Sequence, residues 1–220
     1  EIAYLNGWIS REDVLEVYSR PFNEKRPVIC MDEKPFQLVD EYLEPIPMSK
    51  DNHIEKYDCE YVRKGSCSIF MFTEPLGGWR EAHAMPHRTA LDWAAQVKWL
   101  IDDAYPDAEK IVLVMDNLNT HTIASFYKAF EPAEAYRLSQ KLEIHYTPKH
   151  GSWLDIAEIE LSALTVQCLL GVRIPSIDDL NRTLTAWHKN RNAAQKGVSW
   201  QFTSETARIK LKHLYPVIKF

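Results

Sequence analysis

Residues 89–170 alternate between helical and strand patterns, and this alternation restricts the possible folds more than any other feature of the chain. Strands are predicted at residues 110–115, which are mostly apolar, and at residues 142–146. Helical spacing of apolar residues predicts helices around them, at residues 89–103, 120–140 and 153–170. Strands joined by crossover helices lie parallel in one sheet. This part of the chain therefore predicts two parallel strands covered by helices.

The residues before this segment predict antiparallel strands. A short apolar run at residues 26–31 indicates a buried strand. We expect a hairpin made of strands 57–63 and 66–73 around a tight turn at Lys64-Gly65, and one more strand at residues 79–85. Antiparallel strands followed by parallel strands with crossover helices are the order of the ribonuclease-H-like fold. The fold class predicted is therefore α/β, with a mixed sheet of that kind.

Further helices are predicted at both ends of the chain. They lie at residues 11–20, where Pro21 ends the helix, and at residues 177–191 and 204–214, where Thr203 or Ser204 can serve as the N-cap. We divide the chain into a lead-in helix and linker at residues 1–25, a ribonuclease-H-like core at residues 26–170, and a C-terminal helical extension of the same domain at residues 171–220.

The composition suits a folded protein of the cytoplasm. Hydrophobic residues make up 45% of the chain, which includes seven Trp and supplies a sizeable core. No apolar run approaches the roughly eighteen residues of a membrane span, and the chain does not open like a signal peptide. It opens with Glu1 instead of Met, and its first recognisable pattern is a helix already under way, which suggests a fragment of a longer protein. Four scattered cysteines predict reduced thiols that are mostly buried.

Charge is distributed unevenly along the chain. The net charge is −5, but residues 186–220 carry seven basic side chains and one acidic one, so this end is +6 and the rest is −11. One interpretation is a metal-binding core beside an anion-binding face, in which Lys210 and Lys212 contact phosphates. The other is a basic helix that only faces solvent. The sequence leaves both open.

Two aspartates stand where apolar runs end. Asp32 follows the run at residues 26–31, and Asp116 follows the run at residues 111–115. Chemistry in α/β sheets is placed at the carboxyl ends of strands, so these acids are a candidate pair. Each could instead serve as a turn or capping residue, Asp116 together with Asn117 and Asn119.

The helix at residues 153–170 offers three acids as a third member. Asp155 stands three residues after Ser152, the spacing of a capping box, which explains it without chemistry. Glu160 points roughly 160° to 200° away from Glu158 around the helix, so we expect Glu160 to be solvated. Glu158 borders the apolar face, where a charge is costly unless it is paired or bound to a metal. Helical phase therefore selects Glu158.

Three carboxylates together suit a hard divalent cation. Mg²⁺ prefers oxygen ligands, and two such ions about 4 Å apart can assist both oxygens of a phosphoryl transfer. A zinc site is disfavoured, because neither His83 with His87 nor His145 with His150 forms the helical His-Glu-x-x-His arrangement of a zinc motif.

Three blocks of sequence resemble bacterial insertion-sequence transposases of the mariner superfamily, DDE-type enzymes, over about residues 13–215. The blocks are Met31-Asp32-Glu33-Lys34-Pro35, the stretch from Val114 to His121, and the stretch from Tyr146 to Leu154 that leads into Ala157-Glu158-Ile159-Glu160-Leu161. The resemblance implies a ribonuclease-H-like fold, a triad of Asp32, Asp116 and Glu158, and Mg²⁺ or Mn²⁺ as two ions. It also implies cleavage at transposon ends, strand transfer into target DNA, a homodimer, and a cytoplasmic, nucleoid-associated bacterial protein.

The chain departs from the pattern of this superfamily in three places. Asp155 stands where Asn is usual, and 41 residues separate Asp116 from Glu158, more than is usual, with residues 130–134 as the expected insertion. The N-terminal helix-turn-helix domains of the superfamily are not recognisable here, so end recognition is absent or supplied elsewhere. Two rival functions stay open: a remnant that binds nucleic acid without cutting, and a ribonuclease-H-like nuclease with another substrate.

Residues that flank the triad have less defined roles. Lys149 and His150 either contact a phosphate or only form a turn. His121 either orients a water molecule or caps a helix. We expect Trp153 and Trp79 to be packing residues rather than platforms for base stacking.

Overall fold

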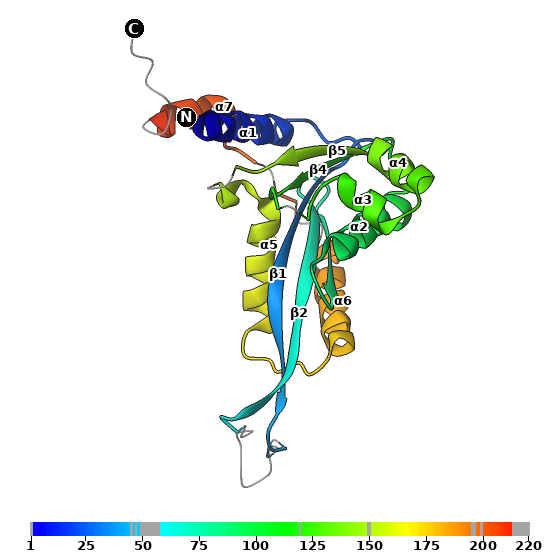
Figure 1. Cartoon of the computed structure of the whole chain (residues 1–220). Helices are drawn as coiled ribbons and strands as arrows, with labels where there is room; N and C mark the ends of the chain where they lie inside the picture. Colours follow the sequence, from blue (N-terminus) through cyan, green and yellow to red (C-terminus); the bar gives the residue numbers. More distant parts are fainter. Residues whose placement is uncertain are drawn as a thin grey trace.

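The computed structural model of the chain describes residues 2–44, 46, 48, 58–118, 120–148, 151–194, 197–198 and 200–212. Its centre is a five-stranded sheet with the order β3-β2-β1-β4-β5 (Figure 1). The strands are β1 (Val28–Glu41), β2 (Tyr61–Glu74), β3 (Trp79–Met85), β4 (Ile111–Met115) and β5 (Leu142–Tyr146). The first three pair antiparallel, and β1, β4 and β5 pair parallel, as the sequence predicts.

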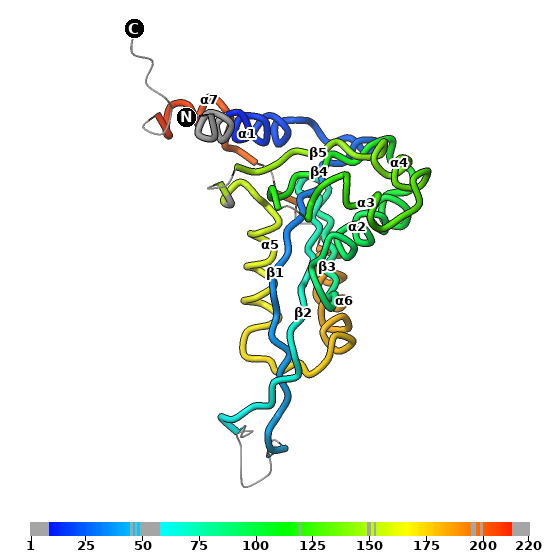
Figure 2. The backbone as a smooth tube through the Cα atoms, in the orientation of Figure 1, coloured from blue at the N-terminus to red at the C-terminus, as the bar shows by residue number. Residues whose placement is uncertain are grey.

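Helices cover both faces of this sheet (Figure 2). They are α1 (Ile2–Tyr18), α2 (Ala90–Trp99), α3 (Ala124–Ala129), α4 (Pro132–Gln140), α5 (Ile156–Leu164), α6 (Ile177–Ala193) and α7 (Ser204–Lys210). Single π-helical turns extend α2 through Ala104 and α5 through Leu169. Helices α1, α5 and α6 share one apolar cluster with one face of the sheet, and α2, α3 and α4 share a second cluster with the other face.

Strand alternation assigns the residues of β1 to these two clusters. Cys30 lies in the cluster with α5 and α6, whereas Ile29 and Met31 lie in the cluster with α2. All five residues of β4 are buried, as expected for a central parallel strand that is covered on both faces. The same alternation decides where the polar residues that follow Met31 point.

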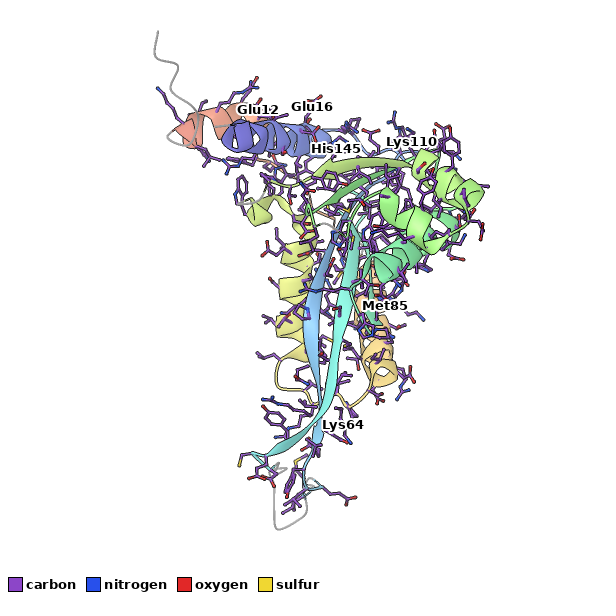
Figure 3. All side chains as sticks on the ribbon, in the orientation of Figure 1. Glu12, Glu16, Lys64, Met85, Lys110 and His145 are labelled. Carbon is purple, nitrogen blue, oxygen red and sulfur yellow. The ribbon has the colours of Figure 1, made fainter. Side chains whose placement is uncertain are left out.

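Helix α1 is held against the sheet and against α7. Val14, Val17 and Tyr18 are buried in the apolar cluster of α5 and α6. His145 on β5 pairs with Asp13 at 2.7 Å, and Figure 3 shows its side chain beneath α1. Glu12 pairs with Arg208 of α7 at 2.7 Å. The predicted lead-in helix thus contributes to the core, and it extends further toward the N-terminus than residue 11.

The predicted hairpin at Lys64-Gly65 is wrong. Residues 61–74 form one continuous strand, because β1 extends to Glu41 and supplies a partner along this length. Gly65 has a φ of 107° and lies at a register shift between Leu38 and Val39. A glycine with positive φ fits a β-bulge as well as a turn, and the bulge is what forms here. Tyr57, where the first predicted strand began, lies outside the described residues.

Several boundaries at the helices also differ from prediction. The predicted helical stretch at residues 120–140 is divided in two, and α4 begins with Pro132, which fits the first turn of a helix but not its interior. Thr203 is the N-cap of α7, as one of the two predicted candidates, and accepts from the backbone of Thr206 at 3.2 Å. Of the predicted end of this helix, residues 213 and 214 lie outside the described part.

The four cysteines are free thiols, of which Cys30 and Cys67 are buried and Cys59 is exposed. Among the described residues, no helix is long and apolar enough to cross a membrane.

Candidate active site

Asp32 and Asp116 follow the last pair of residues that β1 and β4 share. The parallel pairing ends with Met31 beside Met115, and β4 ends there. The expectation that Asp32 also ends its strand is wrong, because β1 continues along β2 to Glu41. The end of the shorter neighbour β4 still leaves both aspartates at the carboxyl end of the parallel pair. Both aspartates thus lie at the end of the parallel strands where their sequence positions predict them.

Burial and nearby acids both raise the pKa of Asp32. Burial raises this pKa from 3.8 to about 7, and the negative charges of Asp116, Glu33 and Glu158 add to the rise. A backbone hydrogen bond from Glu33, 2.8 Å long, acts in the opposite direction. Asp116 at the end of β4 and Glu158 on α5 thus lie near enough to Asp32 of β1 for their charges to act on it.

Helix α5 begins beside the aspartates. Asp155 is its N-cap and accepts from the backbone nitrogen of Ala157 at 2.9 Å, so the predicted capping box that starts at Ser152 is wrong. Asp155 is 3% exposed, and its Oδ2 atom has no hydrogen-bond partner. Burial and then the charge of Asp32 raise its pKa well above the usual value. Glu158 lies in the first turn of α5 and is exposed.

The prediction that Glu160 is solvated is wrong. Glu160 is only 4% exposed, and its carboxylate lies between two arginines. Arg80 of β3 approaches to 3.1 Å and Arg191 of α6 to 3.2 Å. Helical phase gave the correct side of α5 relative to Glu158, but on that side the arginine side chains of β3 and α6 cover Glu160 instead of water. Glu160 is therefore a structural ion-pair residue on the far side from Glu158.

His121 joins Asp116 to a further acid. Its Nδ1 atom lies 2.7 Å from Asp116 Oδ1, and its Nε2 atom lies 3.1 Å from Glu33 Oε1. Burial lowers the pKa of His121, but the two hydrogen bonds outweigh burial and raise this pKa to about 9. The alternative that Asp116 is only a cap does not hold, because the N-cap of α3 is Ile123. Glu33 was not selected from the sequence, although its place next to Asp32 is a signal for it.

A comparison with protein families matches residues 27–181 to the DDE superfamily endonuclease family. The match spans more than two thirds of the chain and contains β1, β4 and α5. This chain belongs to the DDE superfamily of endonucleases. A comparison of its sequence with curated proteins finds no significant match.

Solved structures of the Mos1 mariner transposase share the fold of this DDE endonuclease. The Mos1 catalytic domain with Raltegravir and Mg matches with a TM-score of 0.59 at 14% identity, covering 100% of this chain and 98% of that one. The Mos1 strand transfer complex matches with a TM-score of 0.61 at 13% identity, over 97% and 62%. The Mos1 paired end complex with Mn matches with a TM-score of 0.54 at 15% identity, over 86% and 56%. The chain thus spans little more than half the length of the Mos1 chain in that paired end complex.

The donor chemistry of the DDE endonuclease fits a hard divalent cation. The acids near Asp32, and the unpartnered Oδ2 atom of the buried Asp155, supply the carboxylate oxygens that a hard divalent cation prefers as ligands. The side chains are not gathered into a coordination shell: within the described residues, no three His, Cys, Asp or Glu side chains are close enough to hold an ion. Ion binding would therefore need the carboxylates to draw together.

The predicted phosphate contacts are only partly described. Lys149 and His150 lie outside the described residues. Lys210 and Lys212 are exposed near the end of α7, and the Lys210 ammonium lies 6.0 Å from the centre of the Phe202 ring. Their contact with DNA stays a prediction.

The two tryptophans differ in their surroundings. Trp79 packs against the rings of Trp99 and Tyr105, as predicted for a packing residue. Trp153 meets Phe202 edge-on, but it is 42% exposed, so packing accounts for only part of its surface.

Proposed function

We propose that this chain is the catalytic domain of a DNA transposase, in which Asp32, Asp116 and Glu158 hold divalent metal ions for strand cleavage and strand transfer. The observation that carries the proposal is that Asp32 and Asp116 both follow the last parallel pair of β1 and β4, with the charge of Glu158 on α5 near enough to act on Asp32. Membership of the DDE endonuclease superfamily supports it. So does the fold shared with Mos1, which was solved as a strand transfer complex.

We assign two ions of Mg²⁺ or Mn²⁺ to the carboxylates, since Mos1 was solved with each of these metals. Bound ions would activate the attacking oxygen and stabilise the leaving oxygen of the phosphoryl transfer. The protein's part is to hold acidic ligands on rigid elements. Asp32 is fixed within a central strand, Asp116 is held by His121, and Glu158 lies one turn into a capped helix.

The partners proposed are the two DNA substrates and a second copy of the protein. Duplex DNA would serve as transposon end and as target, and the Mos1 paired end complex supports pairing of two ends by a homodimer. The proposal places the protein in the cytoplasm with the DNA of a bacterial nucleoid. Within the chain, residues 26–170 would form the catalytic core, after the lead-in residues 1–25 and before the C-terminal extension at residues 171–220.

Metal-dependent cleavage of duplex DNA tests this function. The wild-type chain should nick duplex DNA in Mn²⁺ and should melt at a higher temperature when Mn²⁺ is added, because the ion binds the folded state. Asp116→Ala should lose both effects. Duplex binding without any cleavage would favour the remnant that binds but does not cut. Faster cleavage of an RNA/DNA hybrid than of duplex DNA would favour a nuclease of another substrate class.

A further inference from the structure

Glu33 stands next to the proposed ligand Asp32 but points to the other face of the sheet. Successive residues of a strand alternate between faces, and Glu33 follows the alternation of Ile29 and Met31, which lie in the cluster with α2. Its side chain is 2% exposed. A buried carboxylate on that face costs free energy unless it has a partner. His121 is that partner.

The imidazole of His121 is held from several sides. It is 1% exposed, and its ring stacks on Trp93 with centroids 5.9 Å apart. The hydroxyl of Tyr146 donates to the backbone oxygen of His121 at 2.9 Å, and the backbone nitrogen of His121 donates to the backbone oxygen of Leu118 at 3.0 Å. With Nε2 directed at Glu33 and Nδ1 directed at Asp116, the ring has little freedom to rotate.

The Asp116 carboxylate, in contrast, depends on this ring for its orientation. The side chain is 38% exposed and follows the last residue of β4, so packing alone does not fix its rotation. Each ring nitrogen of His121 faces a carboxylate oxygen, Nδ1 that of Asp116 and Nε2 that of Glu33. The three side chains form a bridge from Glu33 through His121 to Asp116.

We propose that His121 is a positioning residue of the active site, which, anchored by Glu33, holds the carboxylate of Asp116 in the orientation that binds the metal ion. This inference rests on the proposed function of Asp116. Groups that orient metal ligands from behind raise the affinity of the site without touching the ion. Glu33 orients Asp116 only indirectly, because it acts by holding His121.

The affinity for Mn²⁺, measured by calorimetric titration of the chain, tests the bridge. His121→Ala should weaken binding by about 10- to 100-fold, the range for partners that orient ligands. Glu33→Ala should weaken binding by about tenfold, and Glu33→Gln, which keeps an acceptor oxygen for His121, should restore the affinity to within about threefold of wild type. The double variant with both alanines should bind no more weakly than His121→Ala, because Glu33 acts through the histidine.

His188→Ala is the matched control for loss of a buried histidine. His188 is 5% exposed, lies in α6, and accepts from the backbone of Ala82 at 3.4 Å. This variant should lose stability while keeping the wild-type affinity for Mn²⁺. A general softening of the fold would weaken Mn²⁺ binding in His188→Ala and His121→Ala alike, and that result would overturn the proposal.

Two other results would also overturn it. One is a folded His121→Ala variant with unchanged or tighter Mn²⁺ binding. The other is an equal loss in Glu33→Gln and Glu33→Ala, which would point to the charge of Glu33 instead of its hydrogen bond. If His121→Ala does not fold, the comparison of Glu33→Gln with Glu33→Ala tests the proposal by itself. Asp116→Ala separates this inference from the proposed function. Unchanged Mn²⁺ binding in that variant would contradict the assignment of Asp116 to the metal site itself.

Discussion

A Glu160→Gln substitution should destabilise the protein and leave its metal binding intact, because Glu160 balances a buried positive charge. The Arg80 side chain is 1% exposed and lies 3.1 Å from the Glu160 carboxylate, which is itself 5% exposed. Burial lowers the pKa of Arg80, and the charge of Glu160 opposes that effect. Glutamine keeps the shape of the side chain and removes the charge. The guanidinium of Arg80 would then stay buried beside a neutral amide.

The size of the effect follows from the burial of this pair. Removing one partner of a buried ion pair costs about 3 to 5 kcal/mol, since the other charge loses its compensation. The second pair adds little, because the Arg191 side chain is 26% exposed and solvent screens it. At about 2 to 4 °C per kcal/mol for a chain of this size, the midpoint of thermal unfolding should fall by roughly 6 to 20 °C.

Glu158→Gln is the matched control, the same substitution two residues earlier in the same helix. Glu158 is exposed, so its charge is not needed for folding, and its loss relieves repulsion from Asp32. Circular dichroism melts without metal should show Glu160→Gln well below wild type and Glu158→Gln at or above it. In a second set of melts, added Mn²⁺ should raise the midpoint of thermal unfolding of Glu160→Gln as much as that of wild type. Glu158→Gln should lose this response.

Two results would refute this reasoning. A Glu160→Gln variant that melts with the wild type would show that the charge of Glu160 contributes nothing to stability. Loss of the Mn²⁺ response in Glu160→Gln together with its retention in Glu158→Gln would show that the wrong acid of α5 has been assigned to the metal.

Two further predictions concern the acids and the basic end. The pKa of Asp32 is raised from 3.8 to about 7, so between these values the folded metal-free protein holds a proton that the unfolded chain has released. The free energy of unfolding, measured with urea in EDTA, should therefore fall as the pH rises from about 4 to about 7. Asp32→Asn should flatten this decline, and an unaltered pH dependence would contradict the assigned shift. Replacing Lys210 and Lys212 together by Gln should flatten the salt dependence of duplex binding by about one to two units, at about 0.9 per phosphate contact, equally for two unrelated duplexes. An unchanged slope would place the DNA path elsewhere.

The parallel half of the sheet followed from the sequence because its signal is local. Five consecutive apolar residues at 111–115 predict a strand buried on both faces, and β4 has these bounds. The strand predicted at residues 142–146 forms as β5 with the same bounds. The antiparallel half was less predictable, because its length depends on pairing between distant segments. Gly65 looked like a turn only while its partner strand was unknown.

The candidate site was reached from the sequence for a similar reason. The ends of apolar runs selected Asp32 and Asp116, and helical phase separated Glu158 from Glu160, although the roles of these residues stay predictions. Asp155 was recognised as a helix-start residue, but its position beside Asp32 depends on how α5 packs against β1. Local spacing alone could not give that proximity.

The sequence by itself determined which side of each strand and helix a residue occupies, since that depends on the periods of the local backbone. Only the tertiary structure decided what each side meets. Glu160 is 31 residues from Arg191, and Glu33 is 88 residues from His121. The arginine side chains that reach Glu160 from β3 and α6 turn an apparently solvated glutamate into a buried ion-pair residue. The pairing of β1 with β4 brings Glu33 and His121 together, although no local sequence pattern links these two residues. Periodicity specifies a direction, and the choice of partner depends on burial across the whole fold.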